Sequence, residues 1–97
     1  MTAAPLTGTR VVDATTRWGE MAGRILAELG AEVIKIEPAA GCDSRRVGPF
    51  HEGESLYWAA MGAGKHSVVA DDPEPYLPDA DVFIESGYRG ALSGRRD

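Results

Sequence analysis

Basic side chains stand beside glycine-rich loops at the ends of predicted strands. Arg45 and Arg46 follow one predicted strand, Lys65 comes just before the next, and Arg89 follows the last. Arginine forks and lysine ammonium groups are the usual protein partners of phosphate. The sequence therefore indicates a phosphate-bearing ligand, and solvated surface cations are the alternative interpretation for each of these residues.

Two common nucleotide-binding motifs do not occur in the expected positions. The first predicted strand-to-helix turn, residues 13–20, lacks the pattern Gly-x-Gly-x-x-Gly, which argues against a standard NAD or FAD site. The segment Gly-Ala-Gly-Lys-His-Ser at 62–67 resembles a P-loop, but it leads into a predicted strand and not out of one. We therefore expect neither a dinucleotide cofactor nor a P-loop nucleotide.

Metal binding and nucleophilic catalysis find little support in the residue spacing. Cys42, His51 and His66 are scattered, without the paired spacings of metal ligands, so no metal is expected. Cys42 has no identifiable base partner that would activate it as a nucleophile. We accordingly assign no catalytic residue within this chain.

Composition limits the class of protein. The 97 residues are enough for one domain, 1–97, and the net charge of −5 argues against nucleic-acid or membrane-surface binding. No apolar run approaches the roughly 20 residues that span a bilayer, and the amino terminus does not resemble a signal peptide. A single cysteine, Cys42, excludes an internal disulfide and favours a reduced, cytoplasmic setting.

The elements that must position these side chains centre on a helix-to-strand junction at 29–38. Glycine suits the left-handed position after a helix, so Gly30 is expected to end a helix over 18–29. The β-branched run at 33–36 predicts a strand, which Pro38 ends. This is the second half of a β-α-β unit, and such units make parallel sheets that bind ligands beyond the carboxyl ends of their strands.

The remaining pattern completes a small α/β fold. Further strands are expected at 10–14, 65–70 and 81–85, with a short helix at 55–61 capped by Ser55 and an irregular loop over 37–54. Thr15 and Thr16 are candidate caps of the first helix. Its apolar face is expected to comprise Trp18, Ala22, Ile25, Leu26 and Leu29, while Glu20 pairs with Arg24 on the opposite, polar face.

Several segments, in order, resemble family III CoA-transferases. The stretch Leu-Ala-Glu-Leu-Gly-Ala-Glu-Val-Ile-Lys-Ile-Glu-Pro at 26–38 is similar to the most characteristic helix-to-strand segment of that family. Similar matches occur at 5–13, 44–50, 53–58, 64–68 and 80–85. The family is CaiB/BaiF-like and includes formyl-CoA transferase, carnitine CoA-transferase and α-methylacyl-CoA racemase. The resemblance covers nearly the whole chain.

The resemblance implies a Rossmann-like three-layer α/β fold with a small, mostly parallel sheet of about four strands, incomplete relative to the family. It implies coenzyme A or acyl-CoA as the substrate, and either transfer of CoA between carboxylic acids or racemisation. Family members are several times longer, and their catalytic aspartate lies beyond Asp97, so this chain alone is expected to be inactive. The residues expected to border CoA are Thr16, Arg17, Trp18, Pro38, Arg45, Arg46, Lys65, His66, Glu85, Ser86, Tyr88 and Arg89.

One sheet face is expected to be thinly covered. The family has a full helix between the third and fourth strands, whereas residues 71–80 here carry three prolines and cannot form a regular helix. Because family enzymes form interlocked dimers, we expect a second copy or a complementing chain to cover this face. The alternative functions are a non-catalytic CoA-binding or protein-interaction module of the same fold, or an unrelated Rossmann-like domain.

Overall fold

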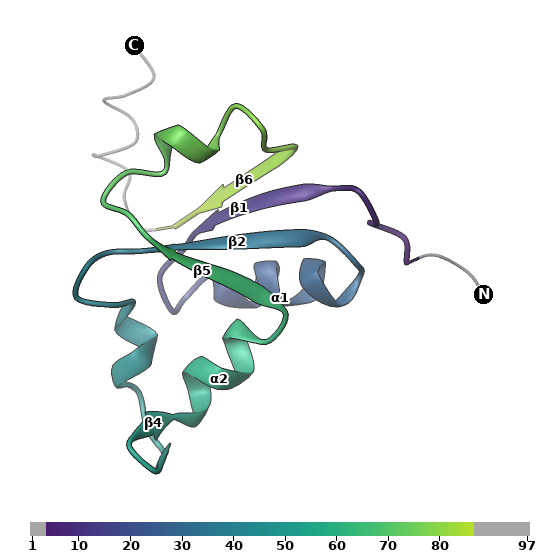
Figure 1. The fold of residues 1–97 in the computed structure, drawn as a ribbon. Helices are drawn as coiled ribbons and strands as arrows, with labels where there is room; N and C mark the ends of the chain where they lie inside the picture. Colours follow the sequence, from purple (N-terminus) through teal and green to yellow (C-terminus); the bar gives the residue numbers. More distant parts are fainter. Residues whose placement is uncertain (1–3, 87–97) are drawn as a thin grey trace.

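A parallel four-stranded sheet forms the centre of the protein. The structure, a computed structural model, describes residues 4–86. The sheet contains β1 (Arg10–Ala14), β2 (Glu32–Glu37), β5 (Lys65–Val69) and β6 (Val82–Glu85), in the order β5-β2-β1-β6 (Figure 1). Every neighbouring pair of these strands is parallel. The predicted α/β class is confirmed, and the predicted strands match the observed ones to within one residue at each end.

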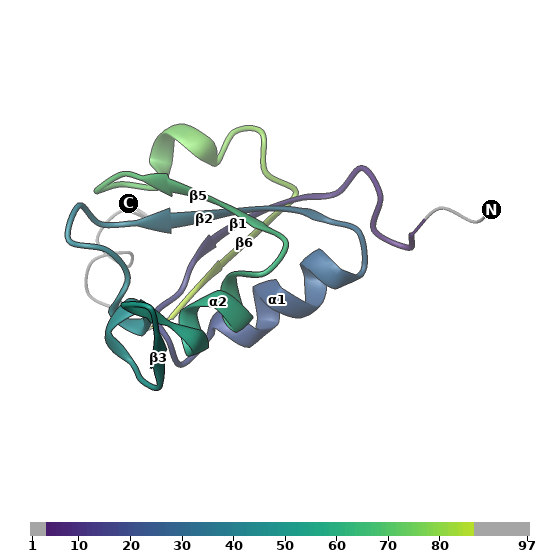
Figure 2. The same ribbon diagram turned by 60° about the horizontal axis from the view of Figure 1, so that its bottom comes forward.

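Both α-helices cover the same face of this sheet. Helices α1 (Glu20–Glu28) and α2 (Leu56–Gly62) lie side by side below it in Figure 2. Ser55 caps α2 as predicted, because its Oγ accepts a hydrogen bond from the backbone N–H of Trp58 at 3.0 Å. The opposite face carries the short 3-10 helix η2 (Glu74–Tyr76). Residues 70–81 form no α-helix, as expected from their three prolines.

The loop between β2 and α2 is more structured than the sequence predicts. It contains the 3-10 helix η1 (Asp43–Arg46) and a two-stranded antiparallel hairpin, β3 (Phe50–His51) and β4 (Glu54–Ser55). The turn places Glu52 and Gly53 at positive φ angles of 51° and 81°. The prediction of an irregular loop over 37–54 was wrong in this respect, because two-residue strands are too short to produce a periodic pattern.

The helix-to-strand junction forms as predicted. Gly30 adopts a φ of 103° directly after α1, and an added Cβ there would meet the side chain of Ala4. The backbone N–H of Ala31 then donates to the carbonyl of Leu26, and β2 begins at the next residue. Gly30 therefore reverses the chain in the space of one residue and places β2 beside β1.

The interior changes character along the strands. Val11, Ala31 and Val33 form the apolar core near the amino ends, packed against partly buried side chains of Leu6, Leu26, Ala27 and Ile84. Two residues further along β1 and β2, the same face presents Asp13 and Lys35, which are paired in register and fully buried. The carboxyl half of the sheet is therefore packed on charged side chains.

The predicted orientation of α1 was wrong for most of its face, although Leu26 packs against the apolar core as predicted. Trp18, Ile25 and Leu29 are 81%, 49% and 40% exposed, whereas Glu20 and Gly23 are buried against the sheet. The reason is that the strand face beneath the start of α1 is charged, so a carboxylate and a small residue fit there better than an apolar stripe. The expected Glu20–Arg24 pair does not form, and Arg24 instead pairs with Glu28 at 3.4 Å.

The predicted cap of α1 was also wrong. Gly19 occupies the cap position, and no side chain accepts a hydrogen bond from the first turn. The hydroxyl and backbone N–H of Thr15 instead donate to Asp13 at 2.6 and 2.9 Å, which removes Thr15 from the helix terminus. Within residues 4–86, no helix has the length and apolar character needed to cross a bilayer.

Candidate functional site

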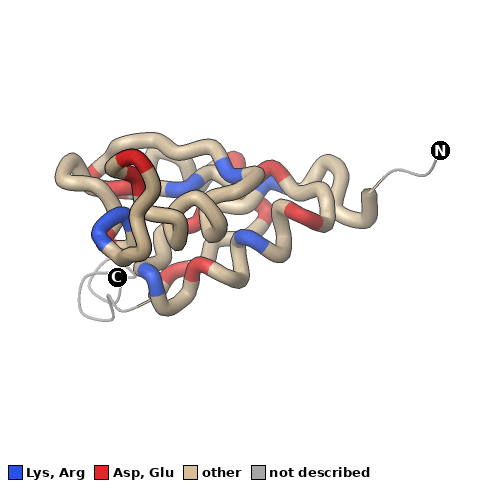
Figure 3. The backbone as a smooth tube through the Cα atoms, turned by 90° about the horizontal axis from the view of Figure 1, so that it is seen from below, with Lys and Arg blue, Asp and Glu red and all other residues tan. Residues whose placement is uncertain are grey.

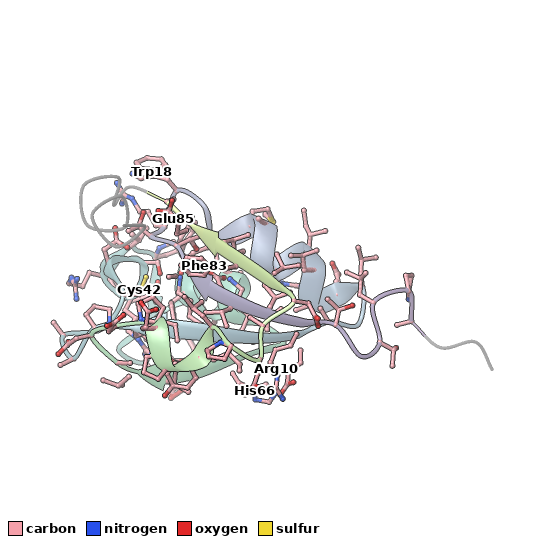
Figure 4. All side chains as sticks on the ribbon, turned by 90° about the horizontal axis from the view of Figure 1, so that it is seen from above. Arg10, Trp18, Cys42, His66, Phe83 and Glu85 are labelled. Carbon is pink, nitrogen blue, oxygen red and sulfur yellow. The ribbon has the colours of Figure 1, made fainter. Side chains whose placement is uncertain are left out.

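The loops after β1 and β6 meet at the carboxyl edge of the sheet. Ser86 Oγ accepts a hydrogen bond from the backbone N–H of Thr16 at 3.1 Å and lies 3.3 Å from the Thr16 hydroxyl. Glu85 ends β6 beside Ala14, the last residue of β1. Trp18 and Glu85 lie at the same end of the molecule in Figure 4. The structure thus brings together Thr16, Glu85 and Ser86 of the predicted residues.

Arg17 and Trp18 project from the first of these loops. The Arg17 guanidinium carbon lies 4.6 Å from the centre of the Trp18 ring, a cation–π distance. The backbone of Arg17 is fixed on both sides, because its N–H donates to Asp43 at 3.2 Å and its carbonyl accepts from the Tyr57 hydroxyl at 3.0 Å. A rigid backbone therefore carries an exposed aromatic ring and a cation at this edge.

The second predicted group lies after β2. Pro38 is exposed directly beyond the strand, and Arg46 donates from Nη1 to the carbonyl of Ala40 at 3.2 Å. Arg45 binds the Glu37 carboxylate through two hydrogen bonds of 2.7 and 2.8 Å. Its guanidinium also lies 4.1 Å from the centre of the Trp58 ring. Arg45 is thus committed to protein partners, whereas Arg46 keeps most of its donors available.

Glu37 is the carboxylate with the clearest electrostatic perturbation. Hydrogen bonds from Arg45, and further ones from Ser67 and the backbone N–H of Cys42, lower the pKa of Glu37 to about 2 against the opposing effect of burial. The Glu37 side chain is 2% exposed, whereas that of its partner Arg45 is 41% exposed, so solvent screens part of the interaction. We call these bonds of Glu37 with Arg45, Ser67 and Cys42 the clasp, and they connect the end of β2 to β5 and η1.

We expect the clasp to make folding stability depend on pH in the acid range. The unfolded chain binds a proton at Glu37 near pH 4.5 and the folded chain only near pH 2, so protonation favours unfolding. Each pKa unit corresponds to about 1.4 kcal/mol, so at most about 3 kcal/mol of stability is present above pH 4.5 and is lost as the pH falls towards 2, less the part that solvent screens at Arg45. Urea unfolding at a series of pH values measures this loss.

The matched variants are Glu37→Gln and Glu32→Gln, which alter a buried and an exposed carboxylate of the same strand. Glu37→Gln should flatten the dependence of unfolding free energy on pH between 4.5 and 2, because the titrating group is gone. Glu32→Gln should keep the wild-type slope, since its side chain is 48% exposed. Equal slopes for wild type and Glu37→Gln would show that Glu37 does not carry the acid sensitivity.

Lys65 and His66 are placed away from this edge. Lys65 opens β5 beside Val33, and its ammonium points beneath the sheet to Asp13 Oδ2 at 2.8 Å and to the Glu20 carbonyl at 2.9 Å. His66 is exposed and pairs with Ile34 in the middle of the sheet, and Figure 4 shows it on the other side of the molecule from Trp18. Tyr88 and Arg89, also predicted to border the ligand, lie outside the described residues.

A buried charge network was missed by the sequence interpretation. It consists of Asp13, Glu20, Lys35 and Lys65, whose side chains are all at most 2% exposed. Lys35 Nζ lies 3.0 Å from Glu20 Oε2 and 3.6 Å from Asp13 Oδ1, and it also donates to the Thr15 carbonyl. Two carboxylates and two ammonium groups thus neutralise one another inside the domain.

A sequence signal for this network did exist. Parallel strands covered on both faces are almost continuously apolar, yet β1 contains Asp13 and β2 contains Lys35. Charged residues are almost never fully buried without a partner, so opposite charges in neighbouring strands indicate an internal pair. Glu20 carried no comparable signal, because on a helix of mixed charge it reads as a surface residue.

Cys42 lies against the same network. Its Sγ donates towards Glu20 Oε2 at 3.4 Å, and the Ser44 hydroxyl donates to the same oxygen at 3.1 Å. Burial raises the pKa of the Cys42 thiol, so the thiolate needed for nucleophilic attack is disfavoured. The geometry therefore gives Cys42 a packing role. Within residues 4–86, His, Cys, Asp and Glu form no group of three arranged to hold a metal ion.

Charges of both signs are interleaved over the helical side of the molecule. Figure 3 shows basic and acidic positions close to one another along the backbone of the described residues. Together with the net charge of −5, this arrangement gives little long-range attraction to a polyanion. The parallel sheet with both α-helices on one face defines the protein as an α/β domain.

Comparison with known proteins identifies the family. Residues 6–93 match the family described as CoA-transferase family III, and the chain belongs to that family. It is 40% identical over 106 residues to succinate–glutarate CoA-transferase of Agrobacterium fabrum, a match that covers 92% of this chain and 26% of that protein. It is 38% identical over 100 residues to succinyl-CoA:glutarate CoA-transferase of mouse, a match that covers 92% of this chain and 23% of that protein.

Solved structures give the same fold. A CAIB/BAIF family protein from Brucella suis superposes with a TM-score of 0.82 at 34% identity, covering 96% of this chain and 28% of the other. The Rv3272 protein of Mycobacterium tuberculosis gives a TM-score of 0.79, also at 34% identity, over 97% of this chain and 28% of that one. The chain spans about a quarter of the length of the relatives it matches. The predicted family and fold are confirmed.

Proposed function

We propose that this chain binds coenzyme A at the carboxyl edge of its sheet, as the N-terminal portion of an enzyme that transfers CoA between carboxylic acids. The observation that carries the proposal is the match of residues 6–93 to CoA-transferase family III, supported by the meeting of the loops after β1 and β6 at one edge of the sheet. The catalytic aspartate belongs to sequence beyond Asp97 or to a complementing chain. A reduced, cytoplasmic setting and a homodimer are parts of the same proposal.

The relatives indicate which part of the reaction this segment serves. Their names include succinate–glutarate, acetyl-CoA:oxalate and succinyl-CoA–L-malate CoA-transferase, and they match this chain at 38–42% identity. The acids differ among these names, while CoA is common to all of them. A segment shared by all of these enzymes is best suited to the common substrate, so we assign CoA, and not the acyl group, to this chain.

The contacts show which of the predicted phosphate-binding side chains already pair with a carboxylate of the protein. Arg45 and Lys65 already bind Glu37 and Asp13, and releasing either would uncover a buried carboxylate. Arg17 stacks on an exposed tryptophan, and among the described contacts of its guanidinium no carboxylate appears. Arg17 and Arg46 are therefore the residues we propose for the CoA phosphates, with Trp18 as a platform for the adenine ring.

A non-catalytic CoA-binding module is the second candidate function. The observation that favours it is the state of the buried carboxylates: Asp13, Glu20 and Glu37 are each engaged by lysine or arginine. A carboxylate that forms an anhydride with an acyl group must be free to attack, and these three are not. Both candidates require CoA to bind, so the binding experiment tests what they share.

We expect CoA to bind the wild-type chain and to bind Arg17→Ala about tenfold more weakly. A hydrogen bond to a charged group contributes about 1.5–3 kcal/mol, and 1.4 kcal/mol is a factor of ten in affinity. Isothermal titration and amide chemical shifts measure the binding. Arg10→Ala is the control, because Arg10 opens β1 at the opposite end of the sheet (Figure 4). The absence of heat and of shift changes at millimolar CoA would refute the proposal for this chain.

A further inference from the structure

The outer face of α1 is apolar and exposed. Met21, Ile25 and Leu29 are 51%, 49% and 40% exposed, and they follow one another at intervals of four residues on the side of α1 that faces away from the sheet. Figure 2 shows α1 in the outer layer on this side of the sheet. We call these three side chains the apolar stripe. An amphipathic helix normally turns such a stripe towards the core, so its exposure here indicates a surface that another protein covers.

No other element of the described residues carries a comparable stripe. Apart from Trp18 in the loop before α1, the remaining exposed large apolar side chains lie one to an element, namely Phe50 on β3, Leu56 on α2, Val69 on β5 and Val82 on β6. Single exposed apolar residues are ordinary on protein surfaces, whereas a contiguous apolar patch marks an interaction site. The apolar stripe of α1 is therefore the best-supported docking surface on this part of the chain.

A row of opposite charges borders the apolar stripe. Arg24 and Glu28 directly precede Ile25 and Leu29, so they lie along the edge of the stripe next to α2, where Arg24 Nε donates to the Ala60 carbonyl at 2.9 Å. Within the chain, Arg24 Nη1 lies 3.4 Å from Glu28 Oε1. The Glu28 side chain is 65% exposed, so its carboxylate can accept further donors. The surface thus favours a partner with an apolar stripe and the reverse order of charges.

A second copy of the chain has these properties when two α1 helices pack antiparallel. A twofold axis at Ile25 places Ile25 against its own copy and Met21 against Leu29 of the second copy. The two charged rows then lie on the same side of the interface and run in opposite directions. Arg24 of each copy is offset from Glu28 of the other by only about 3 Å along the helix axis. In a parallel pair the charged rows would lie on opposite sides of the interface.

We propose that two copies of this chain associate through the apolar stripe of α1, packed antiparallel about a twofold axis. The proposal deepens the homodimer proposed above by naming its interface, and it does not require bound CoA. Trp18 lies beyond the paired segment, so the loop assigned to CoA stays open. One helix face is smaller than the interface of a typical stable complex, so the dissociation constant is expected in the micromolar range or weaker.

Sedimentation velocity of the full 97-residue chain without CoA, from micromolar to millimolar concentration, measures this association. The weight-average sedimentation coefficient should rise from that of a monomer to that of a dimer. Over the same range, ¹⁵N amide shifts should change at the apolar stripe. A monomer at millimolar concentration would overturn the proposal and assign the stripe to a different partner. A dimer whose shift changes lie on another surface would overturn this interface and leave the proposed homodimer standing.

Ile25→Glu tests the centre of the interface. Two carboxylates would then face each other at the twofold axis, so the dissociation constant should rise about tenfold or more. Val69→Glu is the control, because Val69 is 69% exposed on β5, and the same charge there should leave dimerisation unchanged. Circular dichroism checks that both variants are folded. Equal dissociation constants for the wild type and Ile25→Glu would refute the proposed interface.

A pair of charge variants tests the antiparallel geometry and retains an apolar stripe in both chains. Arg24→Glu leaves two carboxylates in the charged row and Glu28→Arg leaves two guanidinium groups, so each variant alone should dimerise several-fold more weakly than the wild type. An equimolar mixture should recover association, since each acidic row then faces a basic one. If the mixture associates no better than the separate variants, the antiparallel arrangement is wrong.

Discussion

Replacing Lys35 with methionine is expected to remove about 3–5 kcal/mol of folding free energy, the typical loss when one partner of a buried ion pair is deleted. Lys35 is 1% exposed, and its ammonium faces Glu20 at 3.0 Å and Asp13 at 3.6 Å. Methionine fills a similar volume, so the loss comes from the uncovered charges and not from a void. Small domains are stable by about 5–15 kcal/mol, and the variant should therefore be close to unfolding.

Urea unfolding followed by circular dichroism measures this loss through the midpoint and the extrapolated free energy. Arg24→Met is the control, because it removes the cation of a more exposed pair, with Glu28, which is worth about 0–1 kcal/mol. The double variant Lys35→Met/Glu20→Gln should lose less than the sum of the single losses, since it removes both charges of the pair. If Lys35→Met cost no more than Arg24→Met, the buried network would not be what stabilises the fold.

The strands and their parallel arrangement could be predicted from the sequence because they depend on local signals. β-branched runs, Gly30 and Pro38 act over a few residues, and each has one dominant physical meaning. The β-α-β pattern then makes the sheet parallel. The family resemblance rested on the order of these same segments, which is why the comparisons confirmed it.

The orientation of α1 could not be read in the same way. Hydrophobic periodicity places the apolar stripe of a helix against the core on the assumption that the core is apolar. Here the sheet presents Asp13 and Lys35 to the start of α1, and Glu20 is buried to match them. That choice depends on side chains 15 or fewer residues away in sequence but on different strands, so it requires the register of β1 against β2.

The same distinction between local signals and strand register applies to the residues of the candidate site. Arg17, Trp18 and Ser86 were predicted from the family resemblance, and they lie in loops after strands, which gather at one edge of a parallel sheet. Lys65 was grouped with them for its charge, but its side chain turns beneath the sheet to Asp13. Charge type alone does not show which face of a strand a residue occupies, and a buried lysine and a ligand-binding lysine look the same in sequence.

Gly23→Ala is expected to destabilise the protein by about 2 kcal/mol or more, although alanine is the better helix former by about 1 kcal/mol. A Cβ at Gly23 would come closer than 3.0 Å to Asp13 Oδ2 and within 3.1 Å of Lys65 Cε. Asp13 is held by Lys65 at 2.8 Å and by the Thr15 hydroxyl at 2.6 Å, so its carboxylate cannot move aside without breaking these bonds. The glycine allows α1 to approach the buried charges.

The matched control is Gly62→Ala in α2, where the nearest heavy atom to an added Cβ is 3.8 Å away. Gly62 is the last residue of α2 and gains no more helix propensity than Gly23 inside α1, so the difference between their urea midpoints gives a lower limit for the cost of the contact with Asp13. A second variant, Gly23→Ala/Asp13→Ala, removes the clash and the bonds together and should lose less than the two single losses combined. Equal stability of Gly23→Ala and Gly62→Ala would mean that α1 can shift, and that the close packing of α1 on Asp13 is not required for folding.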